Sequence, residues 1–190
     1  MRFREQLIAD GSPYLALTEA QLAALEAHFD LPTKWNSRLN LTRITNLEEV
    51  VQFHNCESLF LGTVLPEGNL RICDLGSGAG FPGIPLAITR QECEITLLEA
   101  DQRKAVFLRE AARNLRNVCV AAVRAEAIRE SFDWVVSRAV AVEDVLSSGL
   151  ADNFALLLGG DGVPPGSSVI RVPWGRDRVV AMVSRGTSAI

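Results

Sequence analysis

The feature that most constrains the fold is the segment 72–83, which reads Ile-Cys-Asp-Leu-Gly-Ser-Gly-Ala-Gly-Phe-Pro-Gly. A short apolar run leads into glycines at alternate positions, and Pro82 and Pro85 then mark the start of a helix. Glycines remove the side chains that would keep a ligand away from the end of the strand, and the helix start offers free backbone N–H groups. The segment therefore predicts a strand, a sharp turn and a helix that together bind a nucleotide-like ligand.

The rest of the chain predicts an α/β, Rossmann-like architecture. From residue 70 to about 142, short apolar runs alternate with amphipathic stretches, as in a buried parallel sheet with crossover helices. A last zone of β-branched runs predicts a closing hairpin after a mostly parallel central sheet. The predicted strands are 70–75, 94–98, 118–123, 134–136, 154–158, 169–172 and 179–183, and the predicted helices are 83–89, 101–115 and 142–150.

The first 66 residues are predicted to be helical. Thr18 and Gln21 have the spacing of a capping box, and apolar residues follow at helical spacing. We expect Pro32 to stop or kink this helix. A second helix is predicted over 47–65. The chain should therefore form a helical extension over 1–66 and a core over 67–190, folded as one compact unit.

Composition and charge exclude several classes of protein. The length of 190 residues argues for one domain. The net charge of −4 argues against a non-specific polyanion binder but leaves a specific RNA substrate open. No apolar run approaches a membrane span, and the start lacks a secretory signal, so we expect a cytoplasmic protein without a membrane partner. The four cysteines form no Cys-x-x-Cys pair, so we expect reduced thiols and no metal site.

Two acidic residues narrow the identity of the ligand. Glu99 closes the second predicted strand 23 residues after Gly76, where an acid can bind ribose hydroxyls. Gly78 to Gly83 also satisfies the G-x-G-x-x-G dinucleotide pattern, but Asp74 directly before the loop would repel a pyrophosphate and would suit an ammonium and a sulfonium. We therefore favour S-adenosylmethionine. An NAD(P)-dependent oxidoreductase and a glycine-rich turn without any ligand remain the alternatives.

Several blocks along residues 34–141 carry a family resemblance. They are Lys34-Trp35-Asn36 with Asn40-Leu41-Thr42, His54 with Glu57-Ser58, Asp74 to Ile88, Leu97-Leu98-Glu99 with Arg103-Lys104 and Phe107-Leu108, Arg124-Ala125-Glu126, and Ser137-Arg138-Ala139. The chain thereby resembles the RsmG (GidB) family of 16S rRNA guanine-N7 methyltransferases. The resemblance implies a class I S-adenosylmethionine-dependent methyltransferase fold, methyl transfer to N7 of a guanosine, and 16S rRNA or the small ribosomal subunit as partner of a monomer. A non-catalytic scaffold that binds S-adenosylmethionine remains a further alternative.

The resemblance also implies a set of cofactor-binding residues. Gly76 and Phe81 match positions on the methionine and ribose side, Ala125 and Glu126 match the pair that borders adenine, and Arg138 matches an arginine of the cofactor site. An arginine at a strand end can clamp the methionine carboxylate or an RNA phosphate. A surface acid at Glu126 and a structural ion pair at Arg138 are the alternatives. The complete expected set is Asp74, Gly76, Gly78, Phe81, Glu99, Ala125, Glu126 and Arg138.

No catalytic base is predicted. Guanine N7 has an in-plane lone pair and no proton to lose, so positioning and electrostatics suffice, with Arg138 as the candidate for that role. The Asn/Asp-Pro-Pro-aromatic motif of exocyclic-amine methyltransferases is absent, because that place reads Ser-Arg-Ala-Val from Ser137.

Substrate contact is expected at His54, Arg103 and Lys104. From Asp101 to Arg138 there are eight basic and five acidic residues, a local net charge of +3, which fits either an RNA-docking face or a solvated helix face. A packing role is the alternative for His54, and His28 is expected on the surface. Leu158 stands where the family usually has a lysine, and Glu57 stands where it usually has an aspartate.

Overall fold

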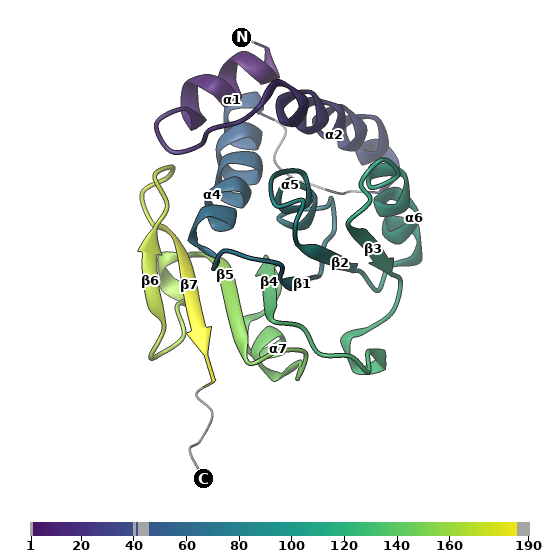
Figure 1. Cartoon of the computed structure of the whole chain (residues 1–190), viewed down its shortest axis with the longest axis vertical. Coiled ribbons are helices and arrows are strands. Elements are labelled where there is room, and N and C mark those ends of the chain that lie inside the picture. Colours follow the sequence, from purple (N-terminus) through teal and green to yellow (C-terminus); the bar gives the residue numbers. More distant parts are fainter. Residues whose placement is uncertain (1, 40, 42–45, 186–190) are drawn as a thin grey trace.

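The computed structural model describes residues 2–39, 41 and 46–185, without the side chains of residues 33, 34, 36–38 and 161. The family blocks at Lys34, Asn36, Asn40 and Thr42 therefore lie outside the described residues or side chains. The fold is a layered α/β arrangement around one twisted sheet (Figure 1). The division into an extension over 1–66 and a core over 67–190 stays a prediction.

The central sheet has seven strands in the order β3-β2-β1-β4-β5-β7-β6. Strands β1 to β5 are parallel, and β7 runs antiparallel to both β5 and β6. The strands are β1 Arg71–Leu75, β2 Glu94–Leu98, β3 Val118–Ala121, β4 Trp134–Arg138, β5 Asn153–Gly159, β6 Ser168–Arg171 and β7 Arg178–Ser184. The predicted mostly parallel sheet with a C-terminal hairpin is thus confirmed, and most strand bounds differ from the prediction by one or two residues.

Helices cover the sheet unevenly. The helical elements are α1 Phe3–Gly11, α2 Glu19–Leu39, α3 Leu47–Glu49, the π-helix η1 Val50–Cys56, α4 Glu57–Val64, α5 Gly83–Thr89, α6 Gln102–Ala111, α7 Val142–Ser147 and the 3-10 turns η2 Ala125–Ala127 and η3 Gly160–Gly162. Helices α1, α2 and α4 to α6 share one apolar cluster with Ile72 and Leu97, whereas α7 packs with Cys73 and Leu75 in another. In Figure 1, α7 accordingly lies apart from the other helices. Alternate residues of β1 therefore point into two different cores, which explains its unbroken apolar run.

The N-terminal helix prediction is partly confirmed. Thr18 Oγ1 accepts a hydrogen bond from Gln21 N at 3.3 Å, and Thr18 N donates to Gln21 Oε1 at 2.9 Å, so the capping box forms. Of the two effects expected of Pro32, the stop is wrong, because α2 continues to Leu39, and the kink stays a prediction. Trp35, beyond the proline, packs edge-on against the Phe107 ring at 5.9 Å. Packing on both sides of the proline outweighs the one backbone hydrogen bond that it removes.

The predicted helix over 47–65 forms, but its middle is π-helical. Residues 50–56 adopt the wider turn, and Asn55 Nδ2 donates to the Val50 carbonyl at 3.3 Å. A 3.6-residue periodicity does not predict this insertion, which shifts the side chains that follow it relative to an α-helix. Among the described residues no helix combines the length and the apolar character that a membrane crossing requires. All four cysteines are free, and Cys119 on β3 is exposed while the other three are buried.

Candidate functional site

The glycine loop after β1 is the centre of the site. Gly76, Gly78 and Gly80 have φ angles of +77°, +55° and +88°, a region that residues with a side chain rarely adopt. A Cβ on Gly76 would lie 2.5 Å from Val140 Cγ2, and one on Gly80 would lie 2.5 Å from Ile84 Cδ1. Both the backbone conformation and the close packing therefore require glycine, and the loop forms a bare backbone cradle at the carboxyl edge of the sheet.

Asp74 on β1 anchors the end of this loop. Its buried carboxylate accepts a hydrogen bond from Gly83 N at 2.9 Å through Oδ2, which ties the first turn of α5 to β1. A Cβ on Gly83 would lie 2.6 Å from the same Oδ2, so this contact also needs a glycine. Oδ1 of Asp74 has no hydrogen-bond partner among the described residues. Burial raises the pKa of Asp74 to about 7, against the opposing effect of its hydrogen bonds.

Glu99 connects the glycine loop to the next strand. Its Oε2 accepts a hydrogen bond from Gly78 N at 3.0 Å, and its Oε1 accepts one from Asp101 N at 2.9 Å. Asp101 in turn caps α6 by accepting from Arg103 N at 2.8 Å. A carboxylate has about four lone-pair sites, so each Glu99 oxygen can accept one further hydrogen bond. Glu99 is half-buried and lies where a ribose hydroxyl could reach it.

Ala125 and Glu126 lie on the same edge, beyond β3. They form the short turn η2, and the strand order β3-β2-β1 places the end of β3 next to the end of β2, which Glu99 follows. Ala125 is half-buried and Glu126 is exposed. The Glu126 carbonyl accepts a hydrogen bond from Arg129 Nη1 at 2.8 Å. The predicted adenine-binding role of this turn stays a prediction, because nothing in the geometry separates it from a surface turn.

Arg138 ends β4 and points toward the π-helix. Its Nη1 donates to the Phe53 carbonyl and to His54 Nδ1, and its Cζ lies 5.4 Å from the centroid of the Phe81 ring. Among the described residues no carboxylate forms an ion pair with Arg138. Burial is the main cause that lowers the pKa of Arg138 to about 10, so the guanidinium stays charged at neutral pH. Arg138 thus joins the edge of β4 to both the π-helix and the glycine loop.

Two histidines enclose the Phe81 ring. The His54 ring stacks on Phe81 at 4.9 Å and 28°, and the His28 ring lies 4.7 Å from it at 45°. Only 5% of His54 is exposed, so the structure places this predicted substrate contact beneath Phe81. Burial lowers the pKa of His54 to about 3 and that of His28 to about 4, so both rings are neutral.

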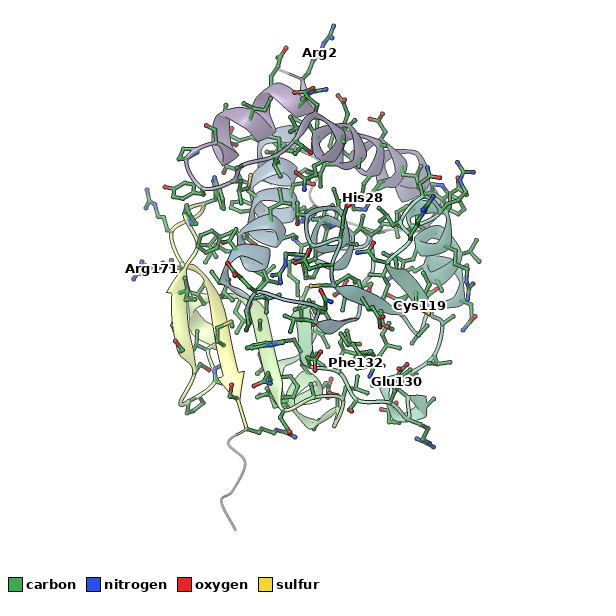
Figure 2. All side chains as sticks on the ribbon, viewed as in Figure 1. Arg2, His28, Cys119, Glu130, Phe132 and Arg171 are labelled. Carbon is green, nitrogen blue, oxygen red and sulfur yellow. The ribbon has the colours of Figure 1, made fainter. Side chains whose placement is uncertain are left out.

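The expectation of a surface position for His28 is wrong. Only 4% of the residue is exposed, and its Nε2 lies 2.9 Å from the Ala79 carbonyl of the glycine loop. In Figure 2 His28 lies on the inner side of α2. The signal was present in the sequence: His28 follows Leu22 and Leu25 at a spacing of three residues, which places all three on one helix face.

A buried ion pair beside Arg138 was not predicted. Glu57, with no exposed surface, receives two hydrogen bonds of 2.6 Å from Nε and Nη2 of Arg178 on β7. Burial raises the pKa of Glu57, and Arg178 opposes this shift. The Arg178 guanidinium also lies 5.9 Å from the Phe53 ring centroid. An acid within the apolar run 56–61 was the available signal, but its partner lies 121 positions away.

The predicted basic face is divided between two edges of the sheet. Arg103, exposed, and Lys104, half-buried, stand in the first turn of α6, next to Glu99. Arg113 and Arg116 follow the end of that helix, immediately before β3 begins. Because α6 runs from the carboxyl edge back to the amino edge, these two pairs lie at opposite ends of the helix. The structure therefore leaves Arg103 and Lys104 near the glycine loop and separates Arg113 and Arg116 from it.

Comparison with known proteins adds family information to this geometry. The family described as rRNA small subunit methyltransferase G (GidB) matches residues 21–153. A ribosomal RNA small subunit methyltransferase G from Nitrosococcus oceani is 43% identical over 129 residues, which cover 66% of this chain and 59% of that protein. One from Xanthomonas campestris is 35% identical over 181 residues, which cover 92% of this chain and 80% of that protein. The match to the first relative thus spans less than two thirds of its length.

Two solved methyltransferase structures have a similar fold. An S-adenosylmethionine-dependent methyltransferase from Aquifex aeolicus superposes with a TM-score of 0.53 at 17% identity, covering 71% of this chain and 93% of that one. An S-adenosylmethionine-dependent O-methyltransferase from Thermotoga maritima gives a TM-score of 0.56 at 12% identity, covering 79% and 69%. These similarities confirm the predicted Rossmann-like class I methyltransferase fold.

Proposed function

Since this chain belongs to the GidB family of rRNA small subunit methyltransferases, we propose that it transfers a methyl group from S-adenosylmethionine to N7 of a guanosine in 16S rRNA. The observation that carries the proposal is the joint position of the glycine loop and Glu99, linked by the hydrogen bond from Gly78 N at 3.0 Å. This is where a class I fold holds a nucleoside, at the carboxyl ends of the first two strands.

The residues present suit this cofactor. Space is open at Gly78, where an added Cβ would meet nothing closer than the Gly76 carbonyl oxygen at 3.8 Å, and Oδ1 of Asp74 is a buried acceptor without a partner among the described residues. A bound S-adenosylmethionine supplies a methyl group activated by a sulfonium. In the proposal Glu99 holds the ribose, the turn at Ala125 and Glu126 borders the adenine, and Phe81 packs beside the methionine end. Arg138 provides a fixed positive charge for the methionine carboxylate or an RNA phosphate.

The proposed chemistry needs no proton transfer from the protein. Guanine N7 attacks with its own lone pair, so the site must orient the base and exclude water. The lowered pKa values of His28 and His54 make both imidazoles neutral at physiological pH, which suits a packing role and does not require either as a base. His54 then acts by orienting Arg138, to which it offers Nδ1.

For the RNA we propose docking at the carboxyl edge. Arg103 and Lys104 lie at this edge in the first turn of α6, where their charges would meet phosphates near the target base. Because the protein has a net charge of −4, we propose that it recognises the RNA by its shape and by a base turned out of the stack, more than by charge alone. In this proposal the protein acts on the RNA as a monomer.

The test is transfer of a labelled methyl group to small-subunit RNA. We expect N7-methylguanosine as the product, micromolar binding of S-adenosylhomocysteine in calorimetry, and no binding of NADH. Binding of NADH alone would favour the oxidoreductase instead. Cofactor binding without labelled RNA, together with unchanged N7-methylguanosine in cells that lack the gene, would favour the scaffold.

A further inference from the structure

A cavity of about 500 Å³ opens beside the proposed site. Its walls are Phe53 of the π-helix, the end of β5 from Leu158 to Gly160, and the turn 175–178 that leads into β7. We propose that this cavity receives a guanine ribonucleotide of the RNA, an inference that rests on the proposed function and gives it a substrate subsite. The volume lies within the roughly 300–1,000 Å³ range of small-molecule sites.

Phe53 makes the cavity continuous with the cofactor edge. Its carbonyl accepts a hydrogen bond from Arg138, while its side chain lines the cavity. The strand register agrees, because Arg138 on β4 pairs with Leu157 on β5 and the cavity begins at the next residue, Leu158. Parallel strands end at the same edge, so a base in the cavity lies one strand away from Arg138.

Phe53 and Arg178 form one wall of the cavity. The Arg178 guanidinium lies 5.9 Å from the Phe53 ring centroid, and its Nε and Nη2 are held by the buried Glu57 carboxylate. Glu57 balances the charge of Arg178 and fixes the orientation of its guanidinium. Arg178 can therefore act as a planar stacking group rather than as a free cation. Unstacked RNA bases pack against aromatic rings and guanidinium planes of this kind.

Among the described side chains, the rim of the cavity carries the exposed acid Asp177 and the exposed cation Arg176. Asp177 offers two carboxylate oxygens, which complement the adjacent N1–H and N2–H donors of guanine, whereas adenine presents an unprotonated N1 there. This pairing leaves guanine N7 without a protein donor and thus available to react. Arg176, on the same turn, suits the phosphate of the nucleotide. Gly159 and Gly162 leave the opposite rim open, since an added Cβ on either would meet nothing within 4 Å.

The test is ligand-observed NMR with guanosine, guanosine monophosphate and adenosine monophosphate at millimolar concentration, in the presence of saturating S-adenosylhomocysteine. We expect guanosine monophosphate to bind roughly tenfold tighter than adenosine monophosphate, as one pair of charge-assisted hydrogen bonds allows. Asp177→Asn should remove this preference for guanine. Arg176→Ala should reduce guanosine monophosphate to the affinity of guanosine.

Two variants control for structure. Arg171→Ala changes an exposed arginine of the same hairpin, at the outer strand β6 (Figure 2), and should leave all three affinities unchanged. Phe53→Leu keeps apolar packing but removes the ring, and should weaken both monophosphates, with an unchanged melting temperature showing that the fold persists.

Three results would overturn the inference: no guanine nucleotide binding, binding that S-adenosylhomocysteine displaces, or binding that Asp177→Asn and Arg176→Ala leave unchanged. Methyl transfer and S-adenosylhomocysteine binding by the unaltered chain are measured in parallel. If the unaltered chain shows neither methyl transfer nor S-adenosylhomocysteine binding, the proposed function is contradicted. The nucleotide affinities of the variants test separately whether the cavity binds a guanine nucleotide.

Discussion

The glycine loop and the π-helix region meet at one edge of the sheet, but they are built from contacts of very different range. In the loop, Asp74 bonds Gly83 nine residues away, and Glu99 bonds Gly78 at a separation of 21. In the π-helix region, Arg138 reaches His54 across 84 positions, and Arg178 reaches Glu57 across 121. The first region can be recognised from a short motif, whereas the second exists only once the whole sheet has formed.

This difference also separates what each region does. In the proposed function, the loop with the neighbouring Asp74 and Glu99 supplies a backbone surface and two acceptors for the cofactor. The π-helix region supplies the contacts that orient Arg138 and the wall of the neighbouring cavity. We therefore expect substitutions in the glycine loop to change ligand binding, and substitutions in the long-range pairs to change the orientation of Arg138 and the stability of the fold.

The largest expected effect is on the long-range ion pair. Arg178→Leu leaves the Glu57 carboxylate buried without a partner and should lower the free energy of unfolding by about 4 kcal/mol. The reverse change, Glu57→Leu, should have a smaller effect, because the Arg178 side chain is 30% exposed and can reach water. Urea unfolding of both variants measures the difference.

The same pair predicts a pH dependence. Burial raises the pKa of Glu57, and without Arg178 only the charge of Arg138 opposes that shift, so the folded Arg178→Leu variant takes up a proton on Glu57 as the pH falls. Its deficit against the unaltered protein should therefore shrink from pH 8 to pH 5. A deficit that is constant with pH would show that packing, rather than charge, links the two residues.

The next largest effect concerns Asp74 in the loop. The folded protein has a pKa of about 7 for Asp74, above the ordinary value of 3.8 for an aspartate, so the folded state binds a proton more tightly and loses stability as the pH rises toward 7. Relative to Asp74→Asn, the unaltered protein should lose about 3 kcal/mol between pH 5 and pH 8. The variant should nevertheless bind S-adenosylhomocysteine more weakly. Parallel stability curves would contradict the account of Asp74.

A smaller effect is expected for the glycine cradle. Gly76→Ala combines a positive φ with a Cβ placed 2.5 Å from Val140, and should reduce stability by about 2 kcal/mol while weakening S-adenosylhomocysteine binding. Gly149→Ala is the matched control, because Gly149 also has a positive φ but an added Cβ meets nothing within 4 Å. It should reduce stability by only about 1 kcal/mol and leave ligand binding unchanged. Thermal unfolding and calorimetry distinguish the two variants.

The smallest effect separates the two ends of α6. Arg103→Ala should raise the KM for RNA roughly fivefold, as loss of one phosphate contact would, with kcat unchanged. Arg113→Ala should change neither constant, since Arg113 follows the far end of the helix. Equal effects of both variants would restore the single basic face that the sequence suggested.

The sequence predicted those features that depend on one residue type meeting a local need, such as a capping hydrogen bond or a positive φ angle. Thr18 and Gln21 predicted the capping box, and the alternate glycines predicted the turn after β1. Strand β2 and helix α5 have the predicted bounds. Pro32 misled the prediction, since its local preference was overridden by tertiary packing of the residues after it.

The site was predicted less completely for the same reason. Residues next to the loop could be named, but the partner of Arg138 could not, because the π-helical turn that presents Phe53 and His54 has no sequence periodicity of its own. The ion pair of Glu57 with Arg178 needs knowledge of which strand lies beside α4. These long-range partners depend on which strands and helices are neighbours in the fold, and a single sequence does not give that order.

The most direct test of the account is a crystal structure of this chain with S-adenosylhomocysteine. The account predicts the nucleoside across the cradle of Gly76, Gly78 and Gly80, with a ribose hydroxyl hydrogen-bonded to Glu99. A complex in which the compound binds elsewhere, and Glu99 contacts only Gly78 and Asp101, would contradict it.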